Sequence, residues 1–171
     1  MLMNIKTLIA SSPLPNFESE ILLAFLLKKD RTFIITYLDK NISSRNYSDF
    51  KKLEKKRLSG YSIAHILSEK EFFSLKFKIN KHTLAPRPLT ELMVEEALAK
   101  AISIPQDLII VDIGTGSGAI IISLAKELRR LNPPLFKKIK FLAIDISRPA
   151  LRIAQENLKK HRLSTKIKLF Y

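Results

Sequence analysis

The sequence predicts an α/β protein in which a small N-terminal helical bundle and a β-hairpin precede a domain built on a parallel sheet. Three observations lead to this prediction. Residues 1–70 repeat apolar side chains at helical spacing. Residues 71–80 alternate apolar and charged side chains, as a half-buried strand does. From residue 107 onward, apolar strands alternate with amphipathic helices, which is the order that gives a parallel sheet with right-handed crossovers.

The helical part rests on local patterns that follow one another along the chain. The segments 18–29 and 31–40 each carry apolar residues at helical spacing, and both are predicted to form core faces. A third helix is expected between Ser48, which is placed as an N-cap, and Gly60, which is placed to end it. A short helix around 62–67 completes the predicted bundle.

The strand signal comes next and marks the division between two parts of the chain. Residues 71–80, EFFSLKFKIN, read as one strand with an apolar face that pairs with a neighbour as a hairpin. The chain then turns at two prolines and enters a helix, with Thr90 placed as its cap. We therefore expect a helical domain over 1–70, a hairpin linker over 71–84 and a second domain over 85–171.

The second domain contains the strand, helix, strand, helix, strand order. The segments are DLIIVDI, SGAIIISLAKELRRL, IKFLAIDI, RPALRIAQENLKKH and KIKLFY. Ligands of such parallel sheets bind at the carboxyl ends of the strands. The segment RRLNPPLFKKIK before the second strand is interpreted as a surface loop, because two prolines after a helix are a common stop signal.

Composition excludes some classes of protein and leaves others open. The chain has no cysteine, which excludes disulfides and thiolate metal sites, and its three histidines lie far apart, so no metal site is expected. The opening residues have too short an apolar run for a membrane span and lack the basic start of a secretory signal, so the expected location is cytoplasmic, without a membrane partner.

The charge is strongly positive and unevenly distributed. The formal net charge is +14, and residues 120–171 hold thirteen Lys and Arg against three acids. Such an excess attracts acidic proteins or nucleic acids without specifying either. Because the charges are spread along helix faces, a solvated surface is the favoured interpretation, and specific nucleic-acid binding is not expected.

Glycine usage points to one ligand site. Three of the four glycines, Gly114, Gly116 and Gly118, fall within five residues, after a strand and before a helix. Glycine allows a positive φ and the close approach of a ligand to the main chain. The strand, glycine loop and helix together therefore predict a cradle for a nucleotide-like ligand, and the loop also fits the dinucleotide pattern G-x-G-x-x-A.

Two acidic residues favour one nucleoside over another. Asp112 stands two residues before the first glycine, where its charge opposes a pyrophosphate but can receive an ammonium group. Asp145 closes the second strand and is placed to accept hydrogen bonds from a ribose diol. Both features suit S-adenosylmethionine, whose amino-acid end is zwitterionic and whose ribose hydroxyls are free. A nicotinamide dinucleotide remains the alternative ligand.

Longer segments carry a family resemblance. GTGSGAIIISLA and AIDISRPALRIAQEN resemble the first two motifs of class I methyltransferases. The preceding GYSIAHILSEKEFFSLKFKINKHTLAPRPLTELMVEEAL resembles the HemK-type protein-(glutamine-N5) methyltransferases of peptide-chain release factors. The resemblance runs from about residue 18 to residue 171. It implies a truncated Rossmann-like class I methyltransferase domain, preceded by a helical domain that helps to hold the release factor.

The resemblance also implies which residues form the site. The cofactor would be S-adenosyl-L-methionine, with its methionine end wrapped by the glycine loop and its ribose held by Asp145. Phe72 or Phe73, Thr90 and Glu91 would lie near the same pocket, although the two aromatic residues can equally be hairpin core and Thr90 a simple helix cap. The predicted cofactor-binding residues are Asp112, Gly114, Thr115, Gly116, Ser117, Gly118 and Asp145.

The substrate half of the chemistry is not recognised in this sequence. The family holds the glutamine amide of the Gly-Gly-Gln loop with an Asn-Pro-Pro-Tyr motif after its fourth strand, whereas this sequence ends at Tyr171. Asn132-Pro133-Pro134 precedes Leu135 and the second strand, so it is interpreted as a loop away from the pocket. We therefore predict no catalytic residue here and no methyl transfer by residues 1–171 alone.

The resemblance implies a larger sheet and a longer protein. The sheet of the family has more strands than the three predicted here, so an uncovered edge with exposed apolar surface is expected. The chain is expected to be the amino-terminal part of a longer enzyme, whether as a fragment, a split gene product or an incomplete gene record. The alternative function is a non-catalytic protein- or RNA-binding module from a truncated gene.

Overall fold

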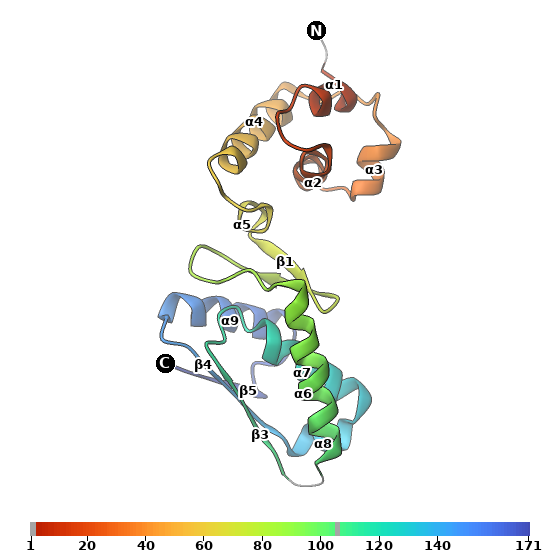
Figure 1. Cartoon of the computed structure of the whole chain (residues 1–171). Helices are drawn as coiled ribbons and strands as arrows, with labels where there is room; N and C mark the ends of the chain where they lie inside the picture. Colours follow the sequence, from red (N-terminus) through yellow and green to blue (C-terminus); the bar gives the residue numbers. More distant parts are fainter. Residues whose placement is uncertain (1–2, 105–106) are drawn as a thin grey trace. The chain divides into compact units, whose positions relative to one another are not determined.

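The computed structural model describes residues 3–104 and 107–171, and the chain folds into two compact units, Met1–Leu67 and Ser68–Tyr171 (Figure 1). Each unit has a hydrophobic core of its own. Across the described part of the chain, no helix is long and apolar enough to cross a membrane, and no three His, Asp or Glu side chains gather as metal ligands would.

The first unit consists of short helices connected by tight turns. They are α1 (Ile5–Ala10), α2 (Asn16–Leu27), α3 (Arg31–Thr36), α4 (Ser44–Leu58) and α5 (Ile63–Leu67). The predicted N-cap at Ser48 is wrong: α4 begins one turn earlier, where the Ser43 side chain accepts a hydrogen bond from the Asn46 N–H at 3.2 Å. Gly60 follows the end of this helix with a φ of +96°, as predicted for a helix-ending glycine.

The first core is formed by the apolar sides of these helices. Leu22, Ile34 and Phe50 are fully buried in it, and Arg57 of α4 holds Glu18 of α2 through two hydrogen bonds of 2.7 and 2.8 Å. The predicted core faces are only partly correct, because Phe25, Tyr37 and Leu38 of the two apolar patterns are exposed. The last two follow the end of α3 at Thr36, so helical spacing no longer directs them inward.

The hairpin belongs to the second unit. Strands β1 (Glu69–Phe72) and β2 (Leu75–Lys78) pair antiparallel around a turn at Phe73 and Ser74, whose φ values are 50° and 57°. Two successive positive φ values are those of the type I′ turn that suits a two-residue hairpin. The expected single strand over 71–80 is therefore corrected to two strands with a turn between them, and the apolar side chains of the hairpin enter the second core.

A 3₁₀ turn, η1 (Pro88–Thr90), leads into α6 (Glu91–Ser103). Thr90 occupies the N-cap position, but its side chain makes no capping hydrogen bond, and its backbone is already helical. The prediction that Thr90 caps the helix through its side chain is therefore wrong. The preceding 3₁₀ turn leaves that side chain available for other contacts.

The predicted parallel sheet of three strands is confirmed. Strands β3 (Ile109–Ile113), β4 (Lys140–Ile144) and β5 (Ile167–Phe170) lie side by side in the order β3, β4, β5, all parallel. The helices α7 (Ala119–Leu131) and α9 (Arg148–Lys160) make the crossovers between them (Figure 1). The sequence therefore gives an α/β fold with a Rossmann-like arrangement of strands and helices.

One face of this sheet is covered and the other is open. Phe141 and Ala143 of β4 are buried with residues of α6 and α7 in the second core. On the opposite face, Ile109 and Ile113 of β3 are 61% and 81% exposed. Within the described residues β3 pairs only with β4, so its second edge is free, as the predicted short sheet requires.

The predicted loop between α7 and β4 is a helix. Residues Pro133–Lys138 form α8, and Asn132 caps it by accepting a hydrogen bond from the Leu135 N–H at 3.1 Å. Proline suits the first helical positions, because those N–H groups have no partner within the helix. The Asn-Pro-Pro sequence is therefore a helix start, and it precedes the amino end of β4, as the sequence indicated.

Candidate ligand site

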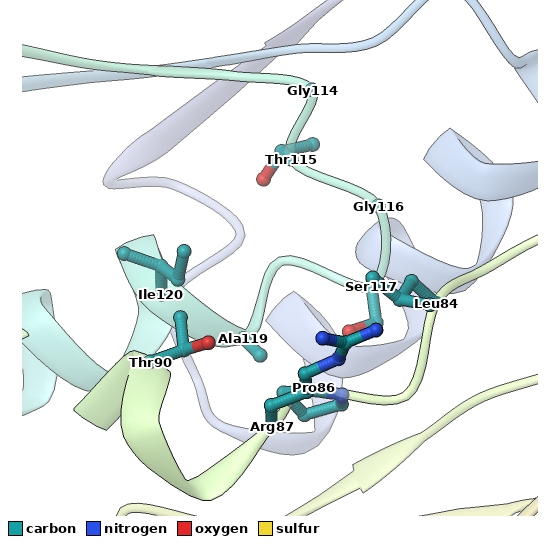
Figure 2. Close-up of a pocket in the computed structure, with 10 residues that line it drawn as sticks. All are labelled: Leu84, Pro86, Arg87, Thr90, Gly114, Thr115, Gly116, Ser117, Ala119 and Ile120. Atoms are coloured by element: carbon teal, nitrogen blue, oxygen red, sulfur yellow. The ribbon is translucent and has the colours of Figure 1, made fainter. Parts of the chain in front are cut away.

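A pocket in the second unit lies between the glycine loop and the segment that leads into α6 (Figure 2). The loop follows β3, so the pocket stands at the carboxyl end of that strand, where ligands of parallel sheets bind. The residues that line it are Leu84, Pro86, Arg87, Thr90, Gly114, Thr115, Gly116, Ser117, Ala119 and Ile120.

The glycines give the loop its path. Gly114, Gly116 and Gly118 have φ values of +76°, +56° and +80°, in the left-handed region that other residues rarely adopt. Beside Gly114 the space is open, since a Cβ there would have no atom within 4 Å. At Gly118 a Cβ would lie 3.0 Å from Cδ1 of Ile122 and 3.6 Å from Cβ of Ala154. The first glycine thus leaves room beside the main chain, and the last leaves space for the side chain of Ile122 in the first turn of α7.

Backbone hydrogen bonds fix the loop to the neighbouring strand. The N–H groups of Gly114 and Thr115 both donate to the carbonyl of Ile144, at 2.8 and 3.0 Å. The Gly118 N–H donates to the carbonyl of Thr115 at 2.8 Å and closes a tight turn within the loop. These hydrogen bonds therefore give the glycine-loop wall of the pocket a defined shape without a ligand.

Asp112 lies beneath the loop and does not line the pocket. Its carboxylate accepts a hydrogen bond from the Thr115 hydroxyl at 2.7 Å. Burial raises the pKa of Asp112, while the Thr115 hydroxyl and the backbone N–H of Ile121 act in the opposite direction and the charge of Asp145 adds to the rise. A cation bound nearby would relieve this cost by stabilising the charged carboxylate.

Asp145 stands at the carboxyl end of β4, as predicted, and is half-buried. One carboxylate oxygen accepts a hydrogen bond from the Gly116 N–H at 2.8 Å, and the other accepts from the Ser147 N–H at 2.8 Å. Each carboxylate oxygen has two lone pairs, so both can accept a further donor. Asp145 therefore shapes the loop and also keeps capacity for ligand hydroxyls.

The other residues expected near the pocket divide into two groups. Thr90 lines it. Phe72 is 1% exposed and belongs to the core, which was the alternative prediction for this residue. The Phe73 N–H donates to the Glu91 carboxylate at 2.7 Å, so this pair ties the hairpin turn to the start of α6.

Several lining residues were not predicted from the sequence, and Arg87 is the most important of them. It lies between two prolines in LAPRPLT, and its side chain extends towards the glycine loop (Figure 2). Within the described residues Arg87 forms no ion pair, and a guanidinium can bind a carboxylate through two parallel hydrogen bonds. The signal available in the sequence was a basic residue held in a proline-restricted segment. The other missed residues are Leu84, Pro86, Ala119 and Ile120.

The chemistry of the pocket is that of a binding site. Its lining includes no His, Lys, Asp or Glu, so no lining side chain is suited to proton transfer near neutral pH. It offers the guanidinium of Arg87 on one side and the glycine loop, backed by two carboxylates, on the other. This distribution suits a ligand that carries both a carboxylate and an ammonium group.

Comparison with known proteins places both units among described domains. Residues 2–67 match the PrmC N-terminal domain, and residues 104–169 match a methyltransferase domain. The chain is 38% identical over 154 residues to the release factor glutamine methyltransferase of Dictyoglomus turgidum, covering 90% of this chain and 51% of that protein. The protein of the same name from Buchnera aphidicola is 40% identical over 146 residues, covering 85% and 49%.

The chain thus spans about half the length of the curated relatives it matches. A third relative, from Shewanella oneidensis, is 39% identical over 120 residues, covering 70% of this chain and 41% of that protein. Among solved structures, the N-terminal domain of human METTL16 in complex with SAH has a TM-score of 0.44 and 25% identity, covering 86% of this chain and 54% of that chain. That structural similarity is too distant to bear on the site.

Proposed function

We propose that this chain, a homologue of the amino-terminal half of the release factor glutamine methyltransferases, binds S-adenosyl-L-methionine in the glycine-loop pocket. The observation that carries the proposal is the pocket itself. The glycine loop, which the sequence predicts to bind a nucleotide-like ligand, lines this pocket. Opposite the loop lies Arg87, which forms no ion pair among the described residues. The residues present therefore fit a ligand with a zwitterionic end.

Each predicted residue receives a role in this proposal. Gly114 to Ser117 lie against the methionine end, where the open side of Gly114 leaves room for a ligand beside the main chain. Arg87 binds the carboxylate of that end, and Asp112 stabilises its ammonium group from beneath the loop. Asp145 accepts hydrogen bonds from the ribose hydroxyls, and Gly118 supplies the positive φ at the start of α7 and leaves space for the side chain of Ile122.

The reaction we propose for the complete enzyme is N5-methylation of the glutamine in the Gly-Gly-Gln loop of a peptide-chain release factor. S-adenosylmethionine supplies an activated methyl group on its sulfonium. This chain contributes donor binding and orientation, which is a large part of the catalytic effect when two reactants must meet. The Asn-Pro-Pro segment caps and begins α8, so we do not assign it to the glutamine amide, and we propose that the groups that hold this amide belong to another part of the complete enzyme.

We assign the helical segment 1–70 to docking of the release factor, in the cytoplasm where release factors act. The support is the match of residues 2–67 to the PrmC N-terminal domain and the separate core of this unit. The segment 85–171 serves as the partial cofactor-binding domain, with the hairpin beside it.

The charge of the chain favours a second candidate function. The net charge of +14 suits a non-catalytic module that binds an acidic protein or RNA. The two candidates separate in a pull-down: deletion of the first unit, residues 1–67, removes specific capture of a release factor under the first proposal. Under the second, capture of RNA of any sequence falls steeply with salt.

The test of cofactor binding is isothermal calorimetry of the chain with S-adenosylmethionine and with NAD. Binding of the first and not the second is expected, and equal binding of both would overturn the assignment. The test of the reaction is transfer of a radiolabelled methyl group to a release factor. We expect label only from a version extended through a fourth strand and its amide-holding motif, so equal label from residues 1–171 would place the catalytic groups elsewhere.

A further inference from the structure

One buried amide in the second unit joins three parts of the fold. Asn157 of α9 is 0% exposed. Its Oδ1 accepts a hydrogen bond from the Lys78 N–H at 2.8 Å, and its Nδ2 donates to the Lys78 carbonyl at 2.9 Å and to the Ser117 carbonyl at 2.8 Å. Both amide hydrogens and the amide oxygen are therefore engaged. The opposite orientation of the amide would place its NH₂ against the Lys78 N–H, so only this orientation pairs every group.

At Lys78 the side-chain amide of Asn157 takes the place of a neighbouring strand. It accepts from the N–H and donates to the carbonyl of the same residue, which is the pairing that one peptide group makes with another across a sheet. These bonds occupy the edge of β2 that faces away from β1. Asn157 thus fixes the position of the hairpin on α9 through bonds that water cannot replace at a fully buried site.

At Ser117 the same amide reaches the wall of the pocket. Ser117 lines the pocket and is 3% exposed, and its carbonyl is the acceptor. The next residue, Gly118, packs against Ala154 one turn earlier on α9. The glycine loop is therefore held to this helix by a buried hydrogen bond, and Gly118 lies next to Ala154 of the same helix.

We propose that Asn157 is a positioning residue that couples the hairpin to the glycine loop, so that ligand binding in the pocket and the anchoring of β2 depend on each other. The two amide hydrogens belong to one rigid planar group, so a shift of the Ser117 carbonyl moves the bond to Lys78 as well. The identity of the ligand rests on the proposed function. The coupling itself rests only on these three hydrogen bonds.

Three variants separate coupling from a merely structural role. Asn157→Asp keeps the shape and the acceptor for the Lys78 N–H but turns an oxygen towards the two carbonyls. Asn157→Ser removes all three bonds and serves if the aspartate variant does not fold. The matched control is Glu156→Gln on the adjacent residue, because Glu156 also contacts Lys78, but through an ion pair at the surface where both side chains are half exposed.

The first measurement needs no ligand. Hydrogen exchange of the chain should show faster exchange at the amides of Lys78 and of the loop residues Gly116 and Gly118 in the Asn157 variants, by about tenfold, the value of one lost hydrogen bond. Glu156→Gln should leave these amides unchanged. Faster exchange at Lys78 with an unchanged loop would overturn the coupling, and so would equal acceleration throughout the second unit.

The second measurement is calorimetry with S-adenosylhomocysteine as the probe. The Asn157 variants should bind it about tenfold more weakly than the unaltered chain, whereas Glu156→Gln should bind it equally well. In the unaltered chain, the ligand should slow exchange at Lys78, which does not line the pocket. Unchanged affinity in a folded Asn157 variant would overturn the proposal. If the unaltered chain binds no probe, the proposed function fails, and the exchange measurement still decides the coupling.

Discussion

The carboxylate of Asp145 accepts a hydrogen bond from the backbone N–H of Gly116 at 2.8 Å, across 29 positions of sequence. This bond ties the end of β4 to the middle of the glycine loop. Its second oxygen is bonded to the Ser147 N–H at 2.8 Å, so the carboxylate has a fixed orientation. A side chain that both shapes the loop and offers free lone pairs should affect ligand binding in two ways.

Asp145→Ala should weaken binding of S-adenosylmethionine by ~1.5 to 3 kcal/mol, the range for hydrogen bonds to a charged group. The loss combines the missing acceptor for the ribose hydroxyls with a less ordered loop. Calorimetry measures it, with Glu127→Ala as the control, because Glu127 pairs with Arg130 on the surface of α7. Unchanged affinity in Asp145→Ala would contradict the role proposed for this carboxylate.

Asp112→Asn should stabilise the fold at neutral pH and weaken ligand binding. Burial raises the pKa of Asp112 above its ordinary value of 3.8, so between 3.8 and the raised pKa the folded state binds more protons than the unfolded state. The free energy of unfolding therefore falls as the pH rises through this window, and the cost persists at neutral pH. Asparagine avoids that cost and cannot stabilise an ammonium group.

Thermal unfolding at neutral pH and calorimetry with S-adenosylmethionine test this pair of effects together. A lower Tm for Asp112→Asn would contradict the unfavourable charge, and full affinity would contradict the ammonium site. Thr115→Val is the matched variant, because it removes the hydroxyl that bonds Asp112 at 2.7 Å without changing the charge of the site.

Arg87→Gln should weaken binding of S-adenosylmethionine by about tenfold, through loss of a charge-assisted pair with the ligand carboxylate. Arg87→Lys should recover only part of this affinity, because an ammonium group lacks the planar fork of the guanidinium. The free energy of unfolding should not change in either variant, since Arg87 is exposed. Equal affinity in all three proteins would remove Arg87 from the site.

Gly118→Ala should destabilise the second unit more than Gly114→Ala does. Both residues have a positive φ, which costs a substituted residue ~1 to 2 kcal/mol. Only at Gly118 does the added Cβ also approach Ile122, at 3.0 Å. Chemical denaturation of the two variants gives the comparison, and equal loss of stability would show that the side chain of Ile122 moves aside without cost.

His161 should make the second unit less stable as the pH falls. Burial lowers the pKa of His161 below 6.5, although its bond to the Lys76 carbonyl acts in the opposite direction. As the pH falls below 6.5, the unfolded chain binds the proton first, so the free energy of unfolding decreases. His161→Gln should reduce the fall in Tm between about pH 7.5 and about pH 5.5. The exposed His82→Gln is the control, and an equal fall in both variants would exclude His161 as the cause.

The sheet and the glycine loop could be predicted because their signals are local. Alternation of apolar strands with amphipathic helices sets the parallel order, and clustered glycines mark a turn whichever residues surround it. The hairpin turn escaped prediction because Phe73 and Ser74 are not residues that favour a positive φ, and their conformation depends on the core below them. Helix α8 escaped because Asn132 and the prolines were interpreted as a stop, although the same residues favour a helix start.

The pocket could be predicted only on its glycine side. Arg87 precedes the loop by more than a helix of intervening sequence, and no periodic pattern indicates that the two lie opposite each other. The burial of Asn157 could not be predicted either, because a polar residue in an amphipathic helix is expected at the surface. Its burial results from the backbone groups of Lys78 and Ser117, which the folded chain brings to it. Such partners follow from tertiary structure and leave no mark in the local sequence.

Lys78 and Asn157, which are joined by a hydrogen bond, are 79 residues apart in the sequence. This separation sets an order for folding during synthesis on the ribosome. Helices α1 to α5 close a core from segments within the first 67 residues, so that core can form while later residues are still being added. The hairpin is made next, but its outer edge has no partner until α9 has emerged. During that interval β2 is open to other chains, and a pause in translation before residue 157 would prolong its exposure.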